Sequence, residues 1–487
     1  MIIPESIISK NGVVNWVIVL HYVLVSYLIL LPISFLFLTK YAFISTFSLP
    51  ILPILVISFI NKIQQVILIF ISLLPIIQHN SYRGVAIGDF FINVHMVFLL
   101  VIILLVLNNY LYTYSYKDKD SPTLIDKLIL LLAIVSILSL IFANSLDVNH
   151  TKRWLLFYTG IFETVSFFYV ILFYLKKDKN YSEKVIMAIL LSTFSSLIIA
   201  IIEFREVGFS LVNIFLARMH IGFGYHNMNL YGINSAILIP ISFYALLSPR
   251  FKRFKKLTTI ILIINIVLAV LTLNRGTFLI LGVQLFLLSF IKETRKIVFG
   301  IIVVGIAGAL QFSNLLLLYL QRFIGDSGGS QLMDMVDKSA QYRIDAWNTA
   351  LKLLWIYPFG LGAGGFQYGW EKYGTDPTFY LGTPHQLFLS IGVDYGVLAM
   401  IVFIIFIITS ILYSNKLSKF GNTDSSYQQK FITISLISYV AYGMITVGEL
   451  SHLSGFKYPN NGYTLVLLSL IAITSYNYSK MKSFSTK

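Results

Sequence analysis

The chain has 487 residues, of which 57% are hydrophobic and 12% charged, with a net charge of +15 and no cysteine. A soluble domain carries about 25% charged residues, so this composition excludes an ordinary soluble protein. The absence of thiols excludes disulfides, thiol catalysis and cysteine-bound metals. Most basic residues lie in short loops between apolar runs, which indicates membrane orientation and not nucleic-acid binding.

The mean hydropathy of +0.81 comes from long apolar runs. A membrane crossing needs roughly 20 apolar residues, and the chain offers about fourteen runs toward that length. They predict an all-α fold: a polytopic membrane bundle of about 12–14 transmembrane helices with a large extracytoplasmic loop that carries amphipathic helices. The short run that contains Pro75 is expected to be re-entrant or half-buried. In order, the runs are 13–38, 42–60, 64–77, 89–107, 127–144, 154–175, 185–202, 227–248, 257–272, 277–291, 297–312, 386–412, 431–447 and 461–477.

The first run is too long for a signal peptide and lacks a small-residue cleavage site, so we expect it to remain a membrane helix. We divide the chain into four parts. These are N-terminal transmembrane helices (1–202), central transmembrane helices with arginine-bearing external loops (203–312), the large external loop (313–385) and C-terminal transmembrane helices (386–487).

Basic loops predict the orientation of the helices. If the runs alternate, the clusters at 176–179, 250–256, 292–296 and 416–419 fall on one side. The positive-inside rule assigns that side to the cytoplasm, together with both termini. The loops 203–226, 273–276, 313–385 and 448–460 then lie outside.

Lysine and arginine divide differently under this topology. Lysine falls 20 inside and 6 outside, whereas arginine falls 3 inside and 7 outside. The planar fork of arginine matches phosphate in a bidentate manner, so the outer arginines suggest an anionic ligand such as a diphosphate. The alternative is contact with lipid headgroups and structural hydrogen bonds. The outer arginines are Arg83, Arg153, Arg205, Arg218, Arg275, Arg322 and Arg343.

The external loop contains an amphipathic pattern from 339 to 357. Ser339 is its expected N-cap and Pro358 its stop. Arg343 and Trp347 stand four residues apart and share a face, so we expect the helix to lie on the outer membrane surface with Arg343 at headgroup level. The apolar positions are Ile344, Trp347, Leu351, Leu354 and Trp355.

Two further segments of the loop can carry chemistry. A glycine cluster at 358–366 allows close approach of a ligand to the backbone, although such a cluster by itself is typical of any turn. His385 opens the next apolar run, where a neutral imidazole can accept a hydroxyl proton near pH 7. The nearby Asp376 is the alternative base. Asp394 lies about 13 Å further along a helix and is interpreted as structural.

Several segments resemble the O-antigen ligase and Wzy-type polysaccharide polymerase superfamily. They are R-x-x-x-W at 343–347, P-x-G-x-G-x-x-x-F at 358–366, H-[NQ]-x-x-L at 385–389, a glycine-to-asparagine segment at 222–229 and a small-polar-Arg-Gly turn at 274–276. The resemblance covers about 218–413. Gln386 replaces the usual asparagine, and Pro384 replaces a small residue.

The resemblance implies glycosyl transfer outside the membrane, from an undecaprenyl-diphosphate-linked glycan to a hydroxyl of an acceptor glycan. It implies His385 as the catalytic base and Arg218, Arg275 and Arg343 as diphosphate ligands. No cofactor or metal is expected. Besides the two glycans and the lipid bilayer, a flippase and a chain-length regulator are the partners considered. Trp347, Asn229, Gly362 and Gln386 are the supporting residues.

Other functions fit the sequence less well. A flippase or another transporter is the second class, but transporters favour internal repeats and charged midplane paths, neither of which we find. Within the enzyme class, a ligase and a polymerase differ only in the acceptor. The wealth of Ile, Lys, Asn, Tyr and Phe, with few Ala, is typical of an AT-rich gene. Such a gene suits a low-GC Gram-positive bacterium, which has no lipopolysaccharide, although O-antigen gene clusters are also AT-rich. We therefore expect a polymerase in the bacterial cytoplasmic membrane.

Overall fold

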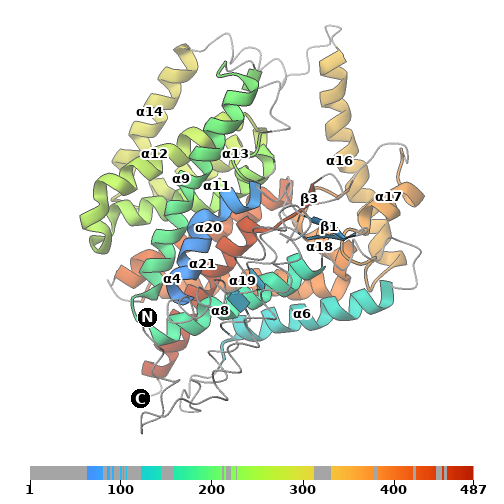
Figure 1. The fold of residues 1–487 in the computed structure, drawn as a ribbon, viewed down its shortest axis with the longest axis horizontal. Coiled ribbons are helices and arrows are strands. Elements are labelled where there is room, and N and C mark those ends of the chain that lie inside the picture. Colours follow the sequence, from blue (N-terminus) through green and yellow to red (C-terminus); the bar gives the residue numbers. More distant parts are fainter. Residues whose placement is uncertain are drawn as a thin grey trace, which may run out of the picture.

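The chain folds into a bundle of helices, seen in a computed structural model (Figure 1). The all-α polytopic fold class is confirmed. Within the described part of the chain, strands occur as two short antiparallel hairpins, β1 (Val85–Ile87) with β2 (Phe90–Ile92) and β3 (His452–Ser454) with β4 (Tyr458–Asn460). The structure describes residues 63–79, 85–87, 90–92, 99–100, 102–103, 106, 122–143, 157–210, 213–214, 221–225, 227–311, 331–376, 382–420, 424–445, 452–454 and 458–485.

Six helical segments of the described residues are long and apolar enough to cross a membrane, and two shorter apolar helices accompany them. The six contain α6, η3 with α8, α9, α11, η4 with α12, and α19; the shorter two are α4 and α13. The helices are α4 (Ile63–His79), α6 (Leu124–Ala143), η3 (Tyr158–Phe162), α8 (Glu163–Lys177), α9 (Tyr181–Val207), α11 (Met228–Leu247), η4 (Pro249–Phe254), α12 (Lys255–Leu271), α13 (Arg275–Ser289), α14 (Arg295–Gln311), α16 (Gln331–Ile356), α17 (Phe366–Tyr373), α18 (Leu387–Tyr395), α19 (Val397–Ser418), α20 (Asp424–Ile445) and α21 (Gly462–Ser485).

The structure corrects several expected boundaries. Pro75 lies inside α4, which is one short helix packed beside α9, and the expectation that it is re-entrant or half-buried stays a prediction. The run 89–107 begins with strand β2. Helix α16 begins at Gln331, so Ser339 is inside the helix and is not its N-cap, whereas the predicted stop before Pro358 is confirmed. The runs 13–38 and 42–60 lie outside the described residues.

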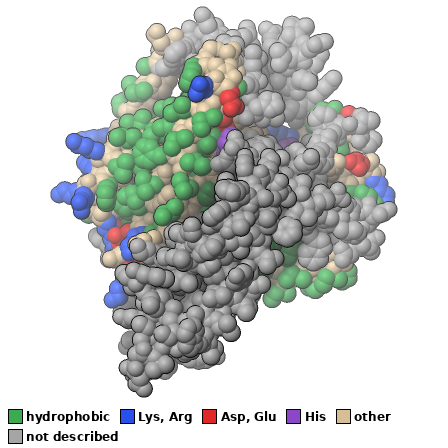
Figure 2. Space-filling view, in the orientation of Figure 1, with side chains coloured by type: hydrophobic (Ala, Val, Ile, Leu, Met, Phe, Trp, Pro, Cys, Tyr) green, Lys and Arg blue, Asp and Glu red, His purple; other side chains and the backbone are tan. Residues whose placement is uncertain are grey.

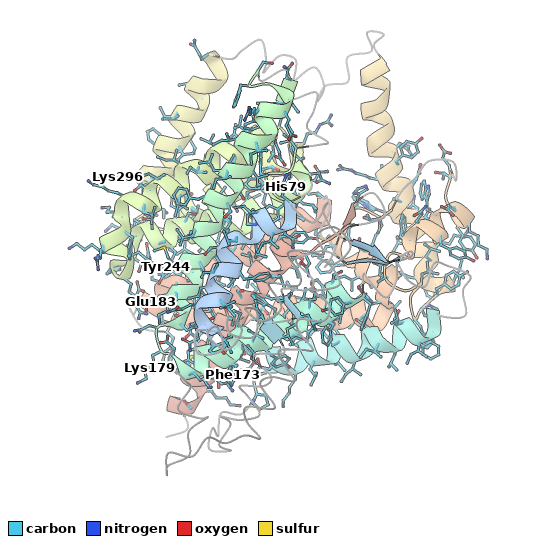
Figure 3. All side chains as sticks on the ribbon, in the orientation of Figure 1. His79, Phe173, Lys179, Glu183, Tyr244 and Lys296 are labelled. Carbon is cyan, nitrogen blue, oxygen red and sulfur yellow. The ribbon has the colours of Figure 1, made fainter. Side chains whose placement is uncertain are left out.

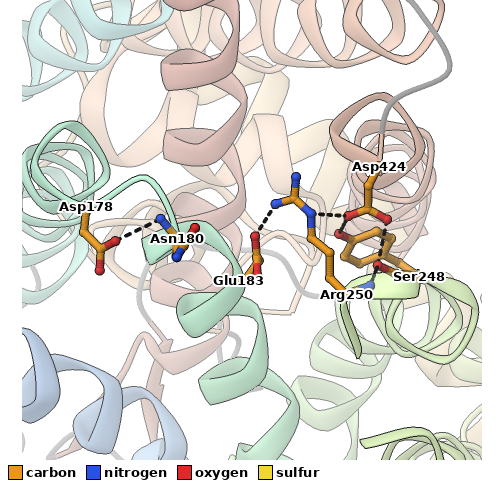
Figure 4. A network of polar contacts seen from close by, with 7 residues as sticks. Asp178, Asn180, Glu183, Ser248, Arg250 and Asp424 are labelled. Carbon is orange, nitrogen blue, oxygen red and sulfur yellow. Dashed lines mark hydrogen bonds and ion pairs between the residues drawn. The ribbon is translucent and has the colours of Figure 1, made fainter. Parts of the chain in front are cut away.

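A network of ion pairs and hydrogen bonds gathers several loops at one end of the bundle (Figure 4). Arg250 contacts Glu183 at the start of α9, and its Nε lies 3.0 Å from Asp424 Oδ2 at the start of α20. Asp424 also accepts hydrogen bonds from Tyr244 (2.8 Å) and Ser248 (2.7 Å). The network fastens α9, α11, η4 and α20 together where the basic loops lie, so we call this the basic end.

The opposite end, here called the site end, is where α4, α9 and α20 finish and where α11, α13, α18 and α21 begin. Figure 3 places His79, the last residue of α4, far from Lys179 and Glu183 of the basic end. Between the two ends, Figure 2 shows a broad hydrophobic surface with lysine and arginine side chains along its edge. A chain that crosses a bilayer presents such a surface to the hydrocarbon.

Helices α16, α17 and α18 form a layer at the site end with its own small core. The turn after α16 packs into a break between α18 and α19. The sequence predicted these two helices to be one, because both lie in the single apolar run 386–412. At the break, Gly396 has φ +94°, Val397 N–H donates to Pro358 O (2.9 Å), and Leu361 N–H donates to Val393 O (2.8 Å). The core residues are Ala346, Ala350, Leu353, Leu354, Leu361, Phe366, Trp370 and Val393.

We predict that Gly396→Ala destabilises the seat of this layer. An added Cβ would lie 2.8 Å from Phe359 C and from Pro358 O, and the left-handed backbone costs an alanine about 1–2 kcal/mol. Thermal unfolding in detergent should show a lower midpoint. Gly300→Ala on α14 is the matched control, since an added Cβ there meets nothing within 4 Å; an equal effect of the two substitutions would contradict the prediction.

Candidate functional site at the end of helix α20

The buried hydroxyl of Tyr442, in the last turn of α20, joins three helices. It donates to Asn229 O (2.8 Å) and accepts from Asn274 Nδ2 (3.1 Å). Asn274 also donates to Asn229 Oδ1. Gly232 makes room for the hydroxyl, since a Cβ there would collide with it. The site ends of α11, α13 and α20 are thereby held together.

Amide side chains cap the three helices that begin around this point. Asn227 Oδ1 accepts from Leu230 N–H (3.0 Å), which opens α11. Asn274 Oδ1 accepts from Gly276 N–H (2.9 Å), which opens α13. Gln386 Oε1 accepts from Leu389 N–H (2.6 Å), which opens α18. Such caps satisfy backbone donors that a helix leaves unpaired, so polar turn residues end each apolar run at a defined place.

A strained residue precedes each of these three caps. Phe223, Leu273 and His385 have φ values of 50°, 46° and 53°, and they are the described non-glycine residues with positive φ. This conformation costs bulky side chains of order 1–3 kcal/mol and concentrates at functional sites. All three lie in segments that the sequence singled out.

The structure places Arg343 within electrostatic range of Arg275. Arg343, on α16, is half-buried and donates to Ile445 O (3.1 Å) at the end of α20. Burial lowers the pKa of the Arg343 guanidinium, the neighbouring Tyr442 raises it, and repulsion from Arg275 lowers it. Two cations that repel each other in a partly buried place would both be stabilised by an anion between them.

The residues that follow His385 contact the same end of α20. The backbone N–H of His385 donates to Thr383 Oγ1 (2.9 Å) in the turn before α18. Gln386 Nε2 donates to Met444 Sδ (3.2 Å), and Leu387 lies against Gly443. Because residues 442 to 445 contact the segments of Asn229, Arg275, Arg343 and His385, the last turn of α20 is the centre of the candidate site.

The other predicted residues are placed as follows. Trp347 lies one turn beyond Arg343, and its buried indole N–H has no hydrogen-bond partner among the described residues. Gly362 (φ +81°) shapes the turn before α17 and its carbonyl accepts from Gly365 N–H (2.8 Å), so its role here is in the fold of the layer.

The two acidic residues of this region have partners on neighbouring helices. Asp376 accepts from Tyr342 on α16 (3.1 Å). The carbonyl of Asp394 accepts from Ser139 on α6 (3.1 Å), in keeping with a structural role. Arg218 lies outside the described residues.

Sequence reasoning missed Tyr442 and Glu203. Glu203, buried near the end of α9, accepts from Gly222 N–H (3.2 Å) and Phe223 N–H (2.9 Å), and His79 Nδ1 lies 3.7 Å from it. Its carboxyl group therefore holds the strained turn that leads to α11. A carboxylic acid at the end of an apolar run is a signal in itself. Tyr442 carries no such signal, because thirty tyrosines are spread along the chain.

Glu163, an acidic residue inside the apolar run 154–175, belongs to a different cluster. It is fully buried and accepts from Asn461 Nδ2 (3.0 Å), which also donates to Thr159 O (2.7 Å). Through these two hydrogen bonds Asn461, just before α21, is joined to η3 and to α8. In the part of the chain that the structure describes, no group of three His, Asp or Glu side chains could hold a metal ion, and independence from metals stays a prediction.

The fold and the site define a multi-pass helical membrane protein with a cationic site at one end of its bundle. Residues 260–404 match the family O-Antigen ligase, which confirms the predicted resemblance to the O-antigen ligase and Wzy superfamily. The match spans α12 to α18 and the first turns of α19. It therefore includes Arg275, Arg343, Trp347 and His385, whereas Asn229 and Tyr442 lie outside it. No match is found among curated proteins.

We predict that Glu203→Gln weakens the turn before α11. One of the two acceptor oxygens becomes an NH₂ group that opposes a backbone N–H, and such a loss costs about 1–3 kcal/mol. Unfolding of the purified protein should occur at a lower temperature. Glu206→Gln, on the exposed side of the same helix, should leave the midpoint unchanged. Equal midpoints for both variants would show that Glu203 does not hold the turn.

Proposed function

We propose that the chain is a polymerase of a cell-surface polysaccharide, such as a capsule, an exopolysaccharide, an O-antigen or a teichuronic-type polymer. It transfers a glycan from an undecaprenyl-diphosphate donor to a sugar hydroxyl of the acceptor. The observation that carries the proposal is that the last turn of α20 contacts Arg343 and the residues next to Arg275 and His385. All three of these residues lie within the span of the family match. A paired guanidinium site suits the two charged phosphates of such a donor.

The proposed reaction is one displacement at the anomeric carbon. The acceptor oxygen forms a bond to this carbon while the bond to the diphosphate oxygen breaks, and the electron pair leaves with the diphosphate. His385 takes the hydroxyl proton. Arg275 and Arg343, with Arg218 as the third proposed ligand, stabilise the charge that grows on the diphosphate, which is usually the largest catalytic contribution. No step needs a metal ion.

The proposed location is the cytoplasmic membrane, with both termini inside and the site end outside. The basic loops gathered at the opposite end support this orientation. A flippase and a chain-length regulator are the proposed partners, because the donor must reach the outer leaflet and the polymer has a finite length.

A ligase of the same superfamily is the second candidate, and a flippase is the third. Reconstituted protein given lipid-linked repeat units alone separates the three. A polymerase lengthens the glycans, a ligase needs a different acceptor, and a flippase changes only the leaflet in which the lipid resides. Unaltered glycan length in the presence of active donor would overturn the polymerase proposal.

Arg275 should be needed for its geometry as well as its charge. We expect Arg275→Ala to lower polymerisation by on the order of 10²–10³ in rate, and Arg275→Lys to remain impaired because lysine lacks the planar fork. Chain growth is followed on gels with the reconstituted protein. Arg253→Lys, exposed at the basic end, is the matched control and should be fully active. Full activity of Arg275→Lys would show that charge alone suffices.

His385 should contribute as general base. A positioned base is worth on the order of 10²–10⁴ in rate, so His385→Ala should lose chain elongation while donor binding to the purified protein persists. The rival base is Asp376, which is held by Tyr342, and Asp376→Asn should therefore retain most activity. The opposite pattern, with elongation kept in His385→Ala and lost in Asp376→Asn, would move the role to the aspartate.

A further inference from the structure

Helix α16 has three different sides. One side carries Ala346, Ala350 and Leu353, which are buried in the core of the α16–α18 layer. At 3.6 residues per turn, Arg343 and Trp347 lie at one edge of this buried side, facing α20. Between residues 341 and 356, the rest of the helix surface is mostly exposed and is divided into an apolar and a polar sector.

The apolar sector, which we call the α16 stripe, consists of Ile344, Leu351 and Trp355. Their spacing of seven and four residues puts them in one line along the helix, directly beside the edge of Arg343 and Trp347. Ile344 and Leu351 are each 50% exposed and Trp355 is 89% exposed. A soluble surface seldom leaves a tryptophan and two aliphatic side chains bare in a row. The polar sector follows further round the helix and contains Gln341, Asn348 and Lys352.

The stripe continues into the hydrophobic surface of a candidate membrane span. Just beyond α16, the exposed ring of Phe359 stacks on Phe142, at a centroid distance of 4.5 Å. Phe142 ends α6, whose outward positions Ile134, Leu138 and Ile141 are also exposed along the helix. Figure 1 shows α6 along the lower right of the bundle, and Figure 2 shows hydrophobic side chains along that edge. A lipid-facing surface thus runs from α6 through Phe359 to Trp355.

We propose that the α16 stripe is seated in the membrane interface of the leaflet at the site end, with Trp355 and Phe359 as its anchors. Tryptophan is enriched at this depth because its ring is apolar and its N–H is polar. The residues beside the anchors are basic and tyrosine side chains, which suit the headgroup region just outside the hydrocarbon. Lys352 Nζ lies over the Tyr373 ring (5.0 Å), and the hydroxyls of Tyr373 and Tyr357 are 3.4 Å apart. The occupant of the stripe is therefore phospholipid.

Membrane contact of the α16 stripe gives a role to the edge of α16 that carries Arg343 and Trp347. With the stripe in lipid, the edge that carries Arg343 and Trp347 lies between the bilayer and the end of α20. A diphosphate attached to a membrane lipid can then reach Arg343 sideways, from the bilayer, without leaving the headgroup level. This consequence rests on the proposed function, whereas the membrane contact itself does not.

The cysteine-free chain allows a test that does not depend on activity. Single cysteines at Leu351 and Trp355 are labelled with an environment-sensitive fluorophore and compared with cysteines at Asn348 and Lys352, on the polar sector of the same helix. The proteins are reconstituted in phospholipid nanodiscs with and without a lipid that carries a nitroxide quencher in the upper part of its acyl chain, below the headgroups. We expect blue-shifted emission and several-fold stronger quenching at 351 and 355 than at 348 and 352.

Two results would overturn the proposal. Emission at 351 and 355 as red as at 348 would place the stripe in water. Blue-shifted emission without quenching by the lipid would mean that protein covers it, either a second copy or another part of the chain. Either result would leave the polymerase proposal standing, because that is decided by elongation of lipid-linked glycans. Absence of elongation together with the expected quenching pattern would overturn the polymerase proposal and leave the membrane contact of the α16 stripe standing.

Discussion

The candidate site depends on one buried hydroxyl group. A phenol removed from water needs both its donor and its acceptor function satisfied, and Tyr442 meets this need with the backbone of α11 and the Asn274 side chain before α13. Once α20 is fixed in this way, its next three residues have little freedom. They contact Leu387, Gln386 and Arg343 in turn. Segments spread along the chain between residues 229 and 445 are thus held at one point, the Tyr442 hydroxyl and the residues that follow it.

Hydropathy predicted the bundle because a lipid-embedded chain must satisfy its backbone within helices, so each crossing is written locally as an apolar run. Arg275 and His385 were predictable for a related reason, since polar turns before such runs are few. The break at Gly396 was not predictable, because it lies inside a mostly apolar run and its cause is the distant Pro358 turn, which packs against it. Glu203 is marked locally as an acid at the end of an apolar run, but its partners in the turn before α11 are not. Tyr442 acts through partners far away in sequence, and no local pattern indicates it.

Positive charges of two kinds lie around the candidate site. The N-termini of α11, α13 and α18 carry partial positive charge from their unpaired N–H groups, and Arg275 and Arg343 add full charges. Strained turns at Phe223, Leu273 and His385 precede these helix starts. Their cost has to be offset elsewhere, and the buried contacts of Glu203, Gln386 and Tyr442 are positioned to do so. Local strain and positive charge thus occur at the same end of the bundle.

Arg343 has a structural contact and a proposed catalytic one, and the two are compatible. Its Nη1 donates to the carbonyl of Ile445, the last residue of α20, where a helix leaves acceptors unpaired. A guanidinium group carries five N–H donors in a fixed fork, so one bond to α20 does not exhaust its capacity for phosphate. The contact instead holds the fork in one orientation, which reduces the entropy lost when an anion binds. Lysine has three donors on one nitrogen and could also reach both groups, but without a planar fork the bond to the carbonyl would not fix the direction of the bond to the phosphate.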